Sequence, residues 1–188
     1  MIRIVILASG SGTNAENIIK YFKGSKSISV VQVLSNKKDA KVLDRANRLK
    51  VSSMCFNRDE FINSDKVLKL LKEKADYIIL AGFLWKIPSN IIEAFSNKII
   101  NIHPALLPKY GGKGMYGMHV HQAVVENNEK ESGITIHYVN ENYDEGAIIF
   151  QKSFKVLATD TAEDVANKVH KLEYKYFPEI IEKVLLEQ

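Results

Sequence analysis

The sequence predicts an α/β fold with a mixed, mostly parallel sheet flanked by helices, and three observations support this prediction. Short apolar runs alternate with stretches of helical period through the first hundred residues. The first apolar run ends in the glycine-containing turn Gly10-Ser-Gly12, just before a helical stretch. The chain has 188 residues, 46% of them hydrophobic, which is enough to bury a core as one domain spanning residues 1–188.

Each expected element in this part follows from a local pattern. Strands are expected at the apolar runs 2–8, 28–34, 77–81 and 99–102, with a short strand near 53–56. Helices are expected where apolar residues recur with helical spacing, at 14–22, 40–49, about 64–74 and 88–95. Pro88 opens the last of these, at the position where proline is tolerated.

The pattern changes after His119. A helix is expected to about residue 127, followed by strands at 133–139 and 147–156 that flank the turn-rich residues 140–146, in the pattern of an antiparallel pair. The glycine-rich residues 111–117 predict a mobile loop. Thr161-Ala-Glu-Asp164 resembles a capping box for a closing helix, which Pro178 is expected to kink or restart.

Composition narrows the classes of function. The formal net charge is +4, but Lys and Glu alternate without a basic block, so nucleic-acid binding is weakly supported and small anionic ligands are equally favoured. Cys55 is alone, which excludes an internal disulfide and a cysteine-based zinc site. The sequence shows neither an apolar run of membrane-spanning length nor a signal peptide, so we expect a cytoplasmic protein without a membrane partner.

The turn after the first strand is a candidate anion site. Gly10-Ser-Gly12-Thr-Asn14-Ala15 precedes the first helix, where backbone N–H groups and the helix dipole favour a phosphate. A dinucleotide site would want an acidic residue at the end of the second strand, but Ser35-Asn36-Lys37-Lys38 stands there. The residues favour a phosphate monoester, while a dinucleotide with a 2′-phosphate and a bare tight turn stay open.

Asn101 and His103 form the candidate catalytic pair. They are two residues apart at the end of a strand, so their side chains point the same way, and Pro104 ends the strand. An amide can donate to a developing oxyanion, while an imidazole moves protons near neutral pH. Asp144, in the turn between two late strands, would raise the pKa of His103 if it lay beside the ring. The alternative is that all three residues satisfy backbone groups in turns and strand ends.

Other polar residues are less informative by themselves. His119 and His121 are spaced i, i+2 on the expected helix and do not share a face, so a metal site is not expected. Arg58 and Glu173 are typical of surface charges.

Several motifs together resemble the phosphoribosylglycinamide formyltransferase family, nearly from end to end. The motifs are Gly10-Ser-Gly-Thr-Asn14, Leu34-Ser-Asn-Lys37, Leu80-Ala-Gly-Phe-Leu84, Asn101-Ile-His-Pro-Ala-Leu-Leu-Pro-Lys-Tyr110 and Asp144-Glu-Gly146. The resemblance implies a Rossmann-like formyltransferase fold. It also implies transfer of a formyl group from 10-formyltetrahydrofolate to the amine of 5-phosphoribosylglycinamide, in purine (IMP) biosynthesis.

The resemblance also implies roles for individual residues. Asn101 and protonated His103 would stabilise the oxyanion, and Asp144 would hold His103 charged and assist proton transfer. Gly12, Thr13 and Asn14 match the cradle for the substrate phosphate, and Glu173 matches a carboxylate that holds the glycinamide substrate. The matching folate-site residues are Arg58, for the glutamyl carboxylate, with Leu84, Trp85, Lys86, Ile87, Asn101, Asn140, Glu141, Asn142, Tyr143 and Asp144.

Rival interpretations are methionyl-tRNA formyltransferase, formyltetrahydrofolate hydrolase and a non-catalytic ligand-binding or weak RNA-binding module. The sequence shows no added domain for either enzyme, and the phosphate loop favours a small phosphorylated acceptor. We therefore expect reduced folate and phosphoribosylglycinamide as small-molecule partners, no nucleic acid, no metal, and a monomer or homodimer.

Overall fold

A computed structural model describes residues 1–187 of the chain. The chain forms two compact units, Met1–Ile100 with Ile181–Gln188, and Asn101–Ile180. Seven strands in the described residues form a mixed sheet of order β3-β2-β1-β4-β5-β6-β7, which confirms the predicted fold class. The single domain predicted from the sequence stays a prediction.

The first unit alternates strands and helices, as the sequence predicts. Its complete elements are β1 (Ile2–Leu7), α1 (Thr13–Tyr21), β2 (Ile28–Ser35), α2 (Lys41–Arg48), β3 (Ser52–Cys55), α3 (Arg58–Ile62), α4 (Lys66–Lys74), β4 (Tyr77–Leu80) and α5 (Ser89–Ala94). The next strand, β5 (Ile99–His103), begins in this unit, and the last helix, α7 (Ala162–Leu186), ends in it. β1 pairs in parallel with both β2 and β4, and β2 pairs in parallel with β3.

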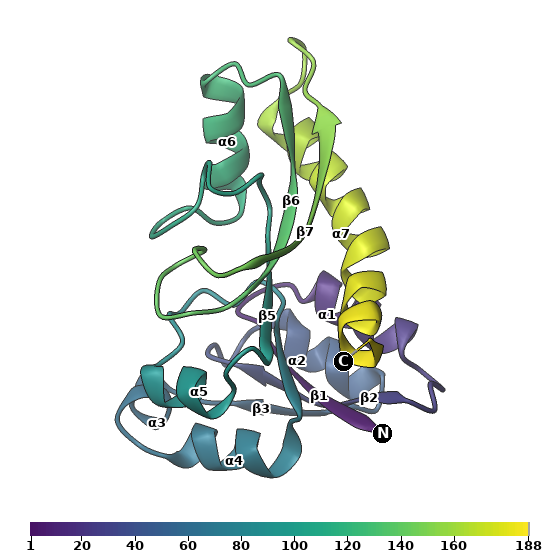
Figure 1. Cartoon of the computed structure of the whole chain (residues 1–188), viewed down its shortest axis with the longest axis vertical. Helices are drawn as coiled ribbons and strands as arrows, with labels where there is room; N and C mark the ends of the chain where they lie inside the picture. Colours follow the sequence, from purple (N-terminus) through teal and green to yellow (C-terminus); the bar gives the residue numbers. More distant parts are fainter. Residues whose placement is uncertain (188) are drawn as a thin grey trace. The chain divides into compact units, whose positions relative to one another are not determined.

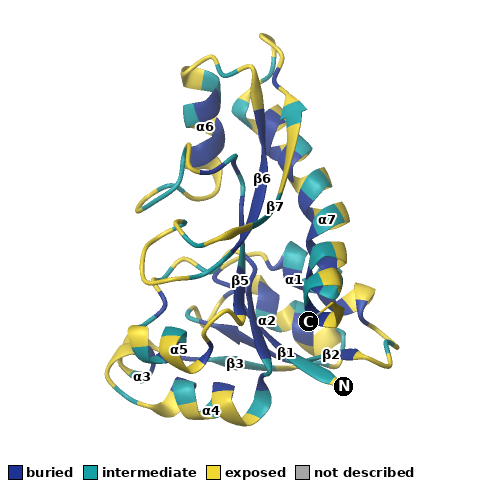
Figure 2. Ribbon diagram, in the orientation of Figure 1, coloured by how far each residue is buried: buried dark blue, intermediate teal, exposed yellow. Residues whose placement is uncertain are grey.

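The core of the first unit covers both faces of these parallel strands. Ile4, Val5 and Ile6 are fully buried although consecutive strand residues point to opposite faces. Helix α1 contacts α2, and α4 contacts α3 and α5. Figure 1 shows the first pair on one side of the strands and the α3–α5 group on the other, and Figure 2 shows the strands buried between them. The buried parallel strands of this unit therefore present functional groups at their ends.

Helix α3 was not predicted, because five residues are too few for a periodic pattern. Its amino terminus is nevertheless marked by a capping box: the Asn57 side chain accepts a hydrogen bond from the Glu60 N–H, and the Glu60 carboxylate accepts one from the Asn57 N–H, each 2.9 Å long. Asn-x-x-Glu in this position was a readable signal.

The second unit contains the end of β5, α6 (Met118–Glu126), β6 (Glu131–Tyr138), β7 (Ile148–Lys155) and most of α7. β6 and β7 pair antiparallel, as predicted, and their register shifts between Ile136 and His137. Such a shift turns a side chain away from the regular alternation. A core cluster of Val124, Val156 and Val165 joins α6, the end of β7 and α7.

Helix α7 begins where the sequence predicts. Thr161 and Asp164 exchange side-chain and backbone hydrogen bonds at its start, which confirms the capping box. Of the two alternatives predicted at Pro178, a restart is wrong, because the helix continues through the proline to Leu186, and a kink stays a prediction. Phe177 and Ile181, on either side of the proline, are fully buried, and this packing offsets the lost backbone hydrogen bond.

Candidate active site

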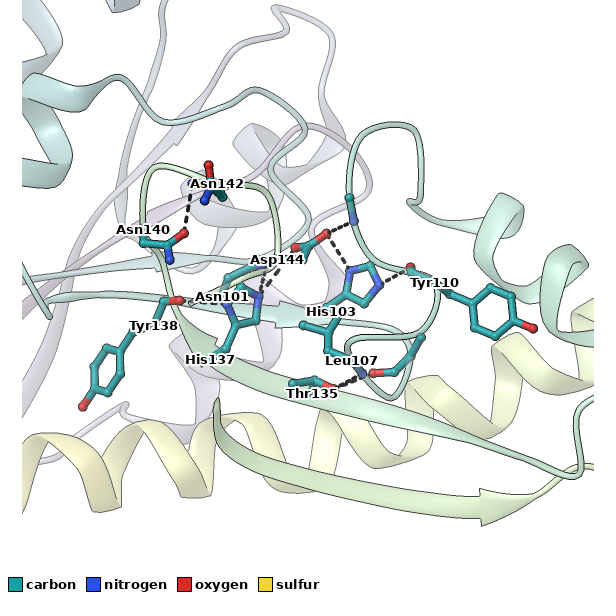
Figure 3. Close-up of polar contacts among 12 residues, drawn as sticks. Asn101, His103, Leu107, Tyr110, Thr135, His137, Tyr138, Asn140, Asn142 and Asp144 are labelled. Carbon is teal, nitrogen blue, oxygen red and sulfur yellow. Dashed lines mark hydrogen bonds and ion pairs between the residues drawn. The ribbon is translucent and has the colours of Figure 1, made fainter. Parts of the chain in front are cut away.

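Four polar residues meet in the second unit, at the end of β5, and we call them the strand-end cluster: Asn101, His103, His137 and Asp144 (Figure 3). Nδ1 of His103 lies 3.5 Å from Oδ2 of Asp144, and Nε2 of His137 lies 3.6 Å from Oδ1 of the same carboxylate. The two imidazole side chains are only 4% and 2% exposed. The approach of Asp144 to His103 that the sequence suggested is therefore present.

Both nitrogens of His103 face acceptors. Nε2 lies 2.7 Å from the Tyr110 carbonyl oxygen, which can only accept, so Nε2 carries a hydrogen. In the neutral ring Nδ1 then presents its lone pair towards Asp144. In the protonated ring Nδ1 gains a hydrogen that points at the carboxylate, so the imidazolium is satisfied on both sides.

The pKa of His103 lies below its ordinary value, although Asp144 raises it as the sequence predicts. Burial lowers this pKa most, because the charged ring loses its hydration. The Asp144 carboxylate and the Tyr110 carbonyl raise it, and His137 lowers it further. The sequence argument had the sign of the carboxylate right but could not weigh it against burial. The lowered pKa favours the neutral ring.

Asp144 is held as a carboxylate. Burial raises its pKa, but its contacts with His137, His103 and the backbone N–H of Gly112 outweigh burial, so the pKa of Asp144 lies below its ordinary value. The Gly112 N–H donates to Oδ2 over 2.9 Å. The Asp144 backbone has φ +56°, a left-handed conformation that aspartate tolerates in turns.

Asn101 is oriented by His137, which the sequence analysis missed. Nδ1 of His137 lies 2.8 Å from the Tyr138 carbonyl oxygen and carries the hydrogen, so Nε2 accepts from the Asn101 amide nitrogen over 3.0 Å. One amide hydrogen of Asn101 is left to donate elsewhere. The signal for His137 was its place two residues after Thr135, on a strand whose other residues in this stretch, Ile134 and Ile136, are apolar.

Thr135 fixes the segment that follows β5. Its hydroxyl accepts from the Leu107 N–H over 3.0 Å (Figure 3) and donates to the Ala105 carbonyl over 2.6 Å. The Gln151 side-chain amide also donates to the Thr135 hydroxyl. A Cβ at Gly111 would lie 2.6 Å from Cδ2 of Leu107 and 3.3 Å from Cβ of Asp144. A residue without a side chain at this position therefore lets the segment pass close to the carboxylate.

Glu173 and His121 are buried in the second unit, although charge pattern alone indicated a surface position for Glu173. Glu173 on α7 is 6% exposed, and His121 on α6 is 3% exposed, whereas His119 is exposed. The two histidines of α6 thus lie on different faces, as the i, i+2 spacing predicts. No group of three or more His, Cys, Asp or Glu side chains in residues 1–187 is arranged to hold a metal ion.

In the first unit, the turn before α1 packs against α2 and accepts hydrogen bonds from it. Gly12 has φ +74°, and a Cβ there would lie 2.3 Å from Cγ2 of Val42. The Gly10 carbonyl accepts from the Val42 N–H, and the Ser11 carbonyl accepts from Nε of Arg45. Helix α1 begins at Thr13, directly after this turn, and the amino terminus of a helix favours an anion.

A surface hollow of about 680 Å³ adjoins this turn, and we call it the lysine hollow. Its lining residues are Ser9, Gly10, Ser11, Lys37, Lys38, Asp39, Ala40 and Lys41. The three lysines make the hollow positive on balance, which favours an anionic ligand.

The other predicted folate-site residues of this unit lie on α3 and after β4. Arg58 is exposed at the start of α3, and Leu84 is 38% exposed. The Leu84 N–H donates to the Ser9 hydroxyl over 3.0 Å, which ties this segment to the end of β1. Ile87 is only 4% exposed, so its side chain packs into the core instead of lining a surface.

Sequence comparison identifies the family. The profile of the formyl transferase family matches residues 2–181. Phosphoribosylglycinamide formyltransferase of Bacillus subtilis is 34% identical over 191 residues, covering 98% of this chain and 95% of the relative. The chloroplastic enzyme of Arabidopsis thaliana is 39% identical over 186 residues, covering 95% of this chain. The chain spans only 64% of the length of that plant relative, and 62% of the one from Vigna unguiculata.

Solved structures agree with the sequence comparison. Glycinamide ribonucleotide transformylase 1 from Geobacillus kaustophilus superposes with a TM-score of 0.89 at 30% identity, covering 98% of this chain and 99% of that one. The transformylase from Symbiobacterium toebii gives 0.87 at 33% identity, covering 96% and 86%. This chain therefore belongs to the formyl transferase family.

Proposed function

We propose that the chain transfers a formyl group from 10-formyltetrahydrofolate to the amine of 5-phosphoribosylglycinamide, as a phosphoribosylglycinamide formyltransferase of purine (IMP) biosynthesis. Membership of the family and the names of the relatives support the reaction class and the acceptor. The observation that carries the proposal is the strand-end cluster, in which an oriented amide donor lies in the same buried group as a histidine and a carboxylate.

In the proposed reaction the amine nitrogen attacks the formyl carbon and the formyl oxygen takes up negative charge. The amide hydrogen of Asn101 that His137 does not use donates to this oxygen. The intermediate then breaks the bond between the formyl carbon and N10 of the folate, which leaves as tetrahydrofolate. One proton is lost from the amine and one is gained by N10, so no net proton is consumed.

His103 and Asp144 transfer that proton from the amine to N10. The lowered pKa of His103 leaves the ring neutral before reaction, which lets it accept the proton of the amine, directly or through water. The imidazolium that forms lies between the Asp144 carboxylate and the Tyr110 carbonyl, which both stabilise it. Its positive charge thus appears together with the oxyanion, and it returns the proton to the leaving nitrogen.

The binding roles follow the family resemblance. Gly12, Thr13 and Asn14 would cradle the phosphate of the ribonucleotide, and buried Glu173 would hold its glycinamide part. Arg58 would bind the glutamyl carboxylate of the folate, because a guanidinium pairs with a carboxylate in bidentate fashion. Residues 84–87 and 140–144 would line the pterin, with Ile87 contributing its backbone, because its side chain is buried.

The decisive experiment incubates the protein with 10-formyltetrahydrofolate, with and without phosphoribosylglycinamide. We expect release of tetrahydrofolate that depends on the acceptor. Equal release without the acceptor would instead indicate a formyltetrahydrofolate hydrolase, and no release with either would favour a binding module.

Location and assembly stay predictions. No helix in residues 1–187 has the length and apolar character needed to cross a bilayer. We propose a cytoplasmic location and a monomer or homodimer, while the plant relatives are named as chloroplastic.

A further inference from the structure

Trp85 is held by three phenylalanine rings in the first unit. It is the single tryptophan of the chain and is partly buried in the segment after β4. Its ring centroid lies 6.2 Å from that of Phe56, 6.0 Å from that of Phe61 and 6.4 Å from that of Phe83. Phe56 and Phe61 are each 1% exposed, so this support is part of the core. The indole therefore has a fixed position with part of its surface open to solvent.

Arg58 lies over this indole. Its Cζ is 5.8 Å from the centroid of the Trp85 ring, in cation–π contact. The side chain makes no hydrogen bond or ion pair with the described residues, and the neighbouring acids are already engaged. Asp59 accepts from Asn63, and Glu60 accepts from the Asn57 N–H and pairs with Lys66.

Two of the three other arginines of the unit differ. Arg3 pairs with Asp76, and Arg45 pairs with Glu16, so their guanidinium groups already have a carboxylate, while Arg48 has no aromatic contact among the described residues. The Arg58 guanidinium combines an aromatic neighbour with N–H donors that have no acceptor in residues 1–187. Contact with a fixed ring limits the rotamers of an arginine while its edge stays available for a bidentate acid.

We propose that Trp85 is a positioning residue that holds Arg58 as a receptor for a carboxylate attached to an aromatic ring. On the proposed function, on which this inference rests, that ligand is the benzoylglutamate end of the reduced folate. The glutamyl carboxylate pairs with Arg58, and the benzoyl ring packs against the open surface of Trp85. The side chain of Trp85 thus contributes to folate affinity through Arg58, beyond what its backbone offers.

The test compares tetrahydrofolate with tetrahydropteroate, which has the same pterin and benzoyl groups but no glutamyl group. Titration calorimetry measures both dissociation constants. We expect Arg58→Ala to weaken tetrahydrofolate binding roughly tenfold to hundredfold, the range for hydrogen bonds to a charged group. Trp85→Leu should weaken it about twofold to fivefold, the range for an exposed cation–π contact. Tetrahydropteroate should lose affinity only with Trp85→Leu, and by less, and Arg48→Ala should change neither constant.

Three further variants test the positioning role. In the Arg58→Ala background, Trp85→Leu should cost less tetrahydrofolate affinity than in the wild type. In the otherwise wild-type chain, Trp85→Phe should keep most of the affinity that Trp85→Leu loses. Arg58→Lys, an exposed change that leaves the ring cluster intact, should lose most of the affinity, because an ammonium lacks the planar fork.

The positioning role would be overturned if Arg58→Ala and Trp85→Leu had additive effects on tetrahydrofolate affinity, or if Arg58→Lys kept full affinity. It would also be overturned if the substitutions weakened the binding of tetrahydrofolate and tetrahydropteroate equally. If those results came with acceptor-dependent formyl transfer, only this inference would fail. If the wild-type protein bound neither ligand, the inference and the proposed function would fail together.

Discussion

In the second unit the polar side chains of the strand-end cluster are buried against one another. In the first unit the charged groups of the lysine hollow and of Arg58 are exposed. Burial gives the cluster fixed tautomers and pKa values moved from their ordinary range. The exposed cations have solvent around them. We infer that the buried cluster performs the chemistry, and that each of its few residues contributes strongly to the reaction rate. The exposed cations bind the ligands, and each of them contributes a small, salt-sensitive part of the affinity.

The largest effect expected from this comparison is that of Asn101→Ala. Losing one oxyanion donor costs about a hundredfold to a thousandfold in turnover. The substitution also leaves Nε2 of His137 without its donor. Turnover at saturating substrates should fall within this range while both Michaelis constants change little. Asn127→Ala, an exposed asparagine of the same unit, is the matched control, and near-normal turnover of Asn101→Ala would remove Asn101 from the mechanism.

The second effect concerns pH and His121. Burial lowers the pKa of His121 to about 4, with smaller contributions from His170 and His103, and its Nδ1 is buried without a hydrogen-bond partner in the described residues. The unfolded chain therefore binds more protons than the folded one below pH 6.5. Stability from the neutral ring is complete above pH 6.5 and is lost as the pH falls towards 4.

His121→Gln should accordingly flatten the acid side of the stability curve. Between pH 6.5 and 4 the wild type should lose roughly 3 kcal/mol more unfolding free energy than the variant. Urea unfolding at a series of pH values measures this difference. His119→Gln, on the exposed face of the same helix, should leave the slope as it is in the wild type. Parallel curves for wild type and His121→Gln would show that His121 titrates normally.

A third prediction compares two glycines of the first unit. Gly12 and Gly24 both have positive φ, but only Gly12 has Val42 at 2.3 Å from where a Cβ would lie; Gly24 has open space. Both alanine variants incur strain from the left-handed backbone. Gly12→Ala should lose about 1–3 kcal/mol more unfolding free energy, the usual cost of overpacking. Equal losses in urea unfolding would mean that α2 moves away freely.

The sequence predicted those parts of the site that depend on local geometry. Asn101 and His103 share a face because a strand has a period of two, and the β-α alternation predicted the parallel strands. The Asp144 contact was a conjecture that depended on how the late strands turn. His137 was missed because a histidine on a strand carries no local sign of its partner, and its register shift is set by the pairing with β7.

Properties that depend on contacts between distant parts of the chain could not be predicted from local sequence patterns. The pKa of His103 depends on a balance between burial and Asp144, and only the sign of the second contribution can be read from residue types. The contact of Arg58 with Trp85 joins a five-residue helix to a segment beyond the next strand, and no periodicity links the two. Glu173 resembled a surface charge because helix period does not show what packs against a helix.

The smallest effect expected is that of a single lysine in the lysine hollow. Lys41→Ala should raise the Michaelis constant for phosphoribosylglycinamide about twofold to fivefold at low salt, because one exposed charge near a phosphate contributes about 1 kcal/mol or less. In 1 M salt the Debye length is about 3 Å, so the effect should vanish. Lys72→Ala, an exposed lysine of α4, is the control at both salt concentrations. The turnover defect of Asn101→Ala should stay unchanged by salt, since its amide acts inside a buried group. A Lys41→Ala effect that persists in high salt would place this lysine in direct, desolvated contact with the ligand and remove the contrast between the two units.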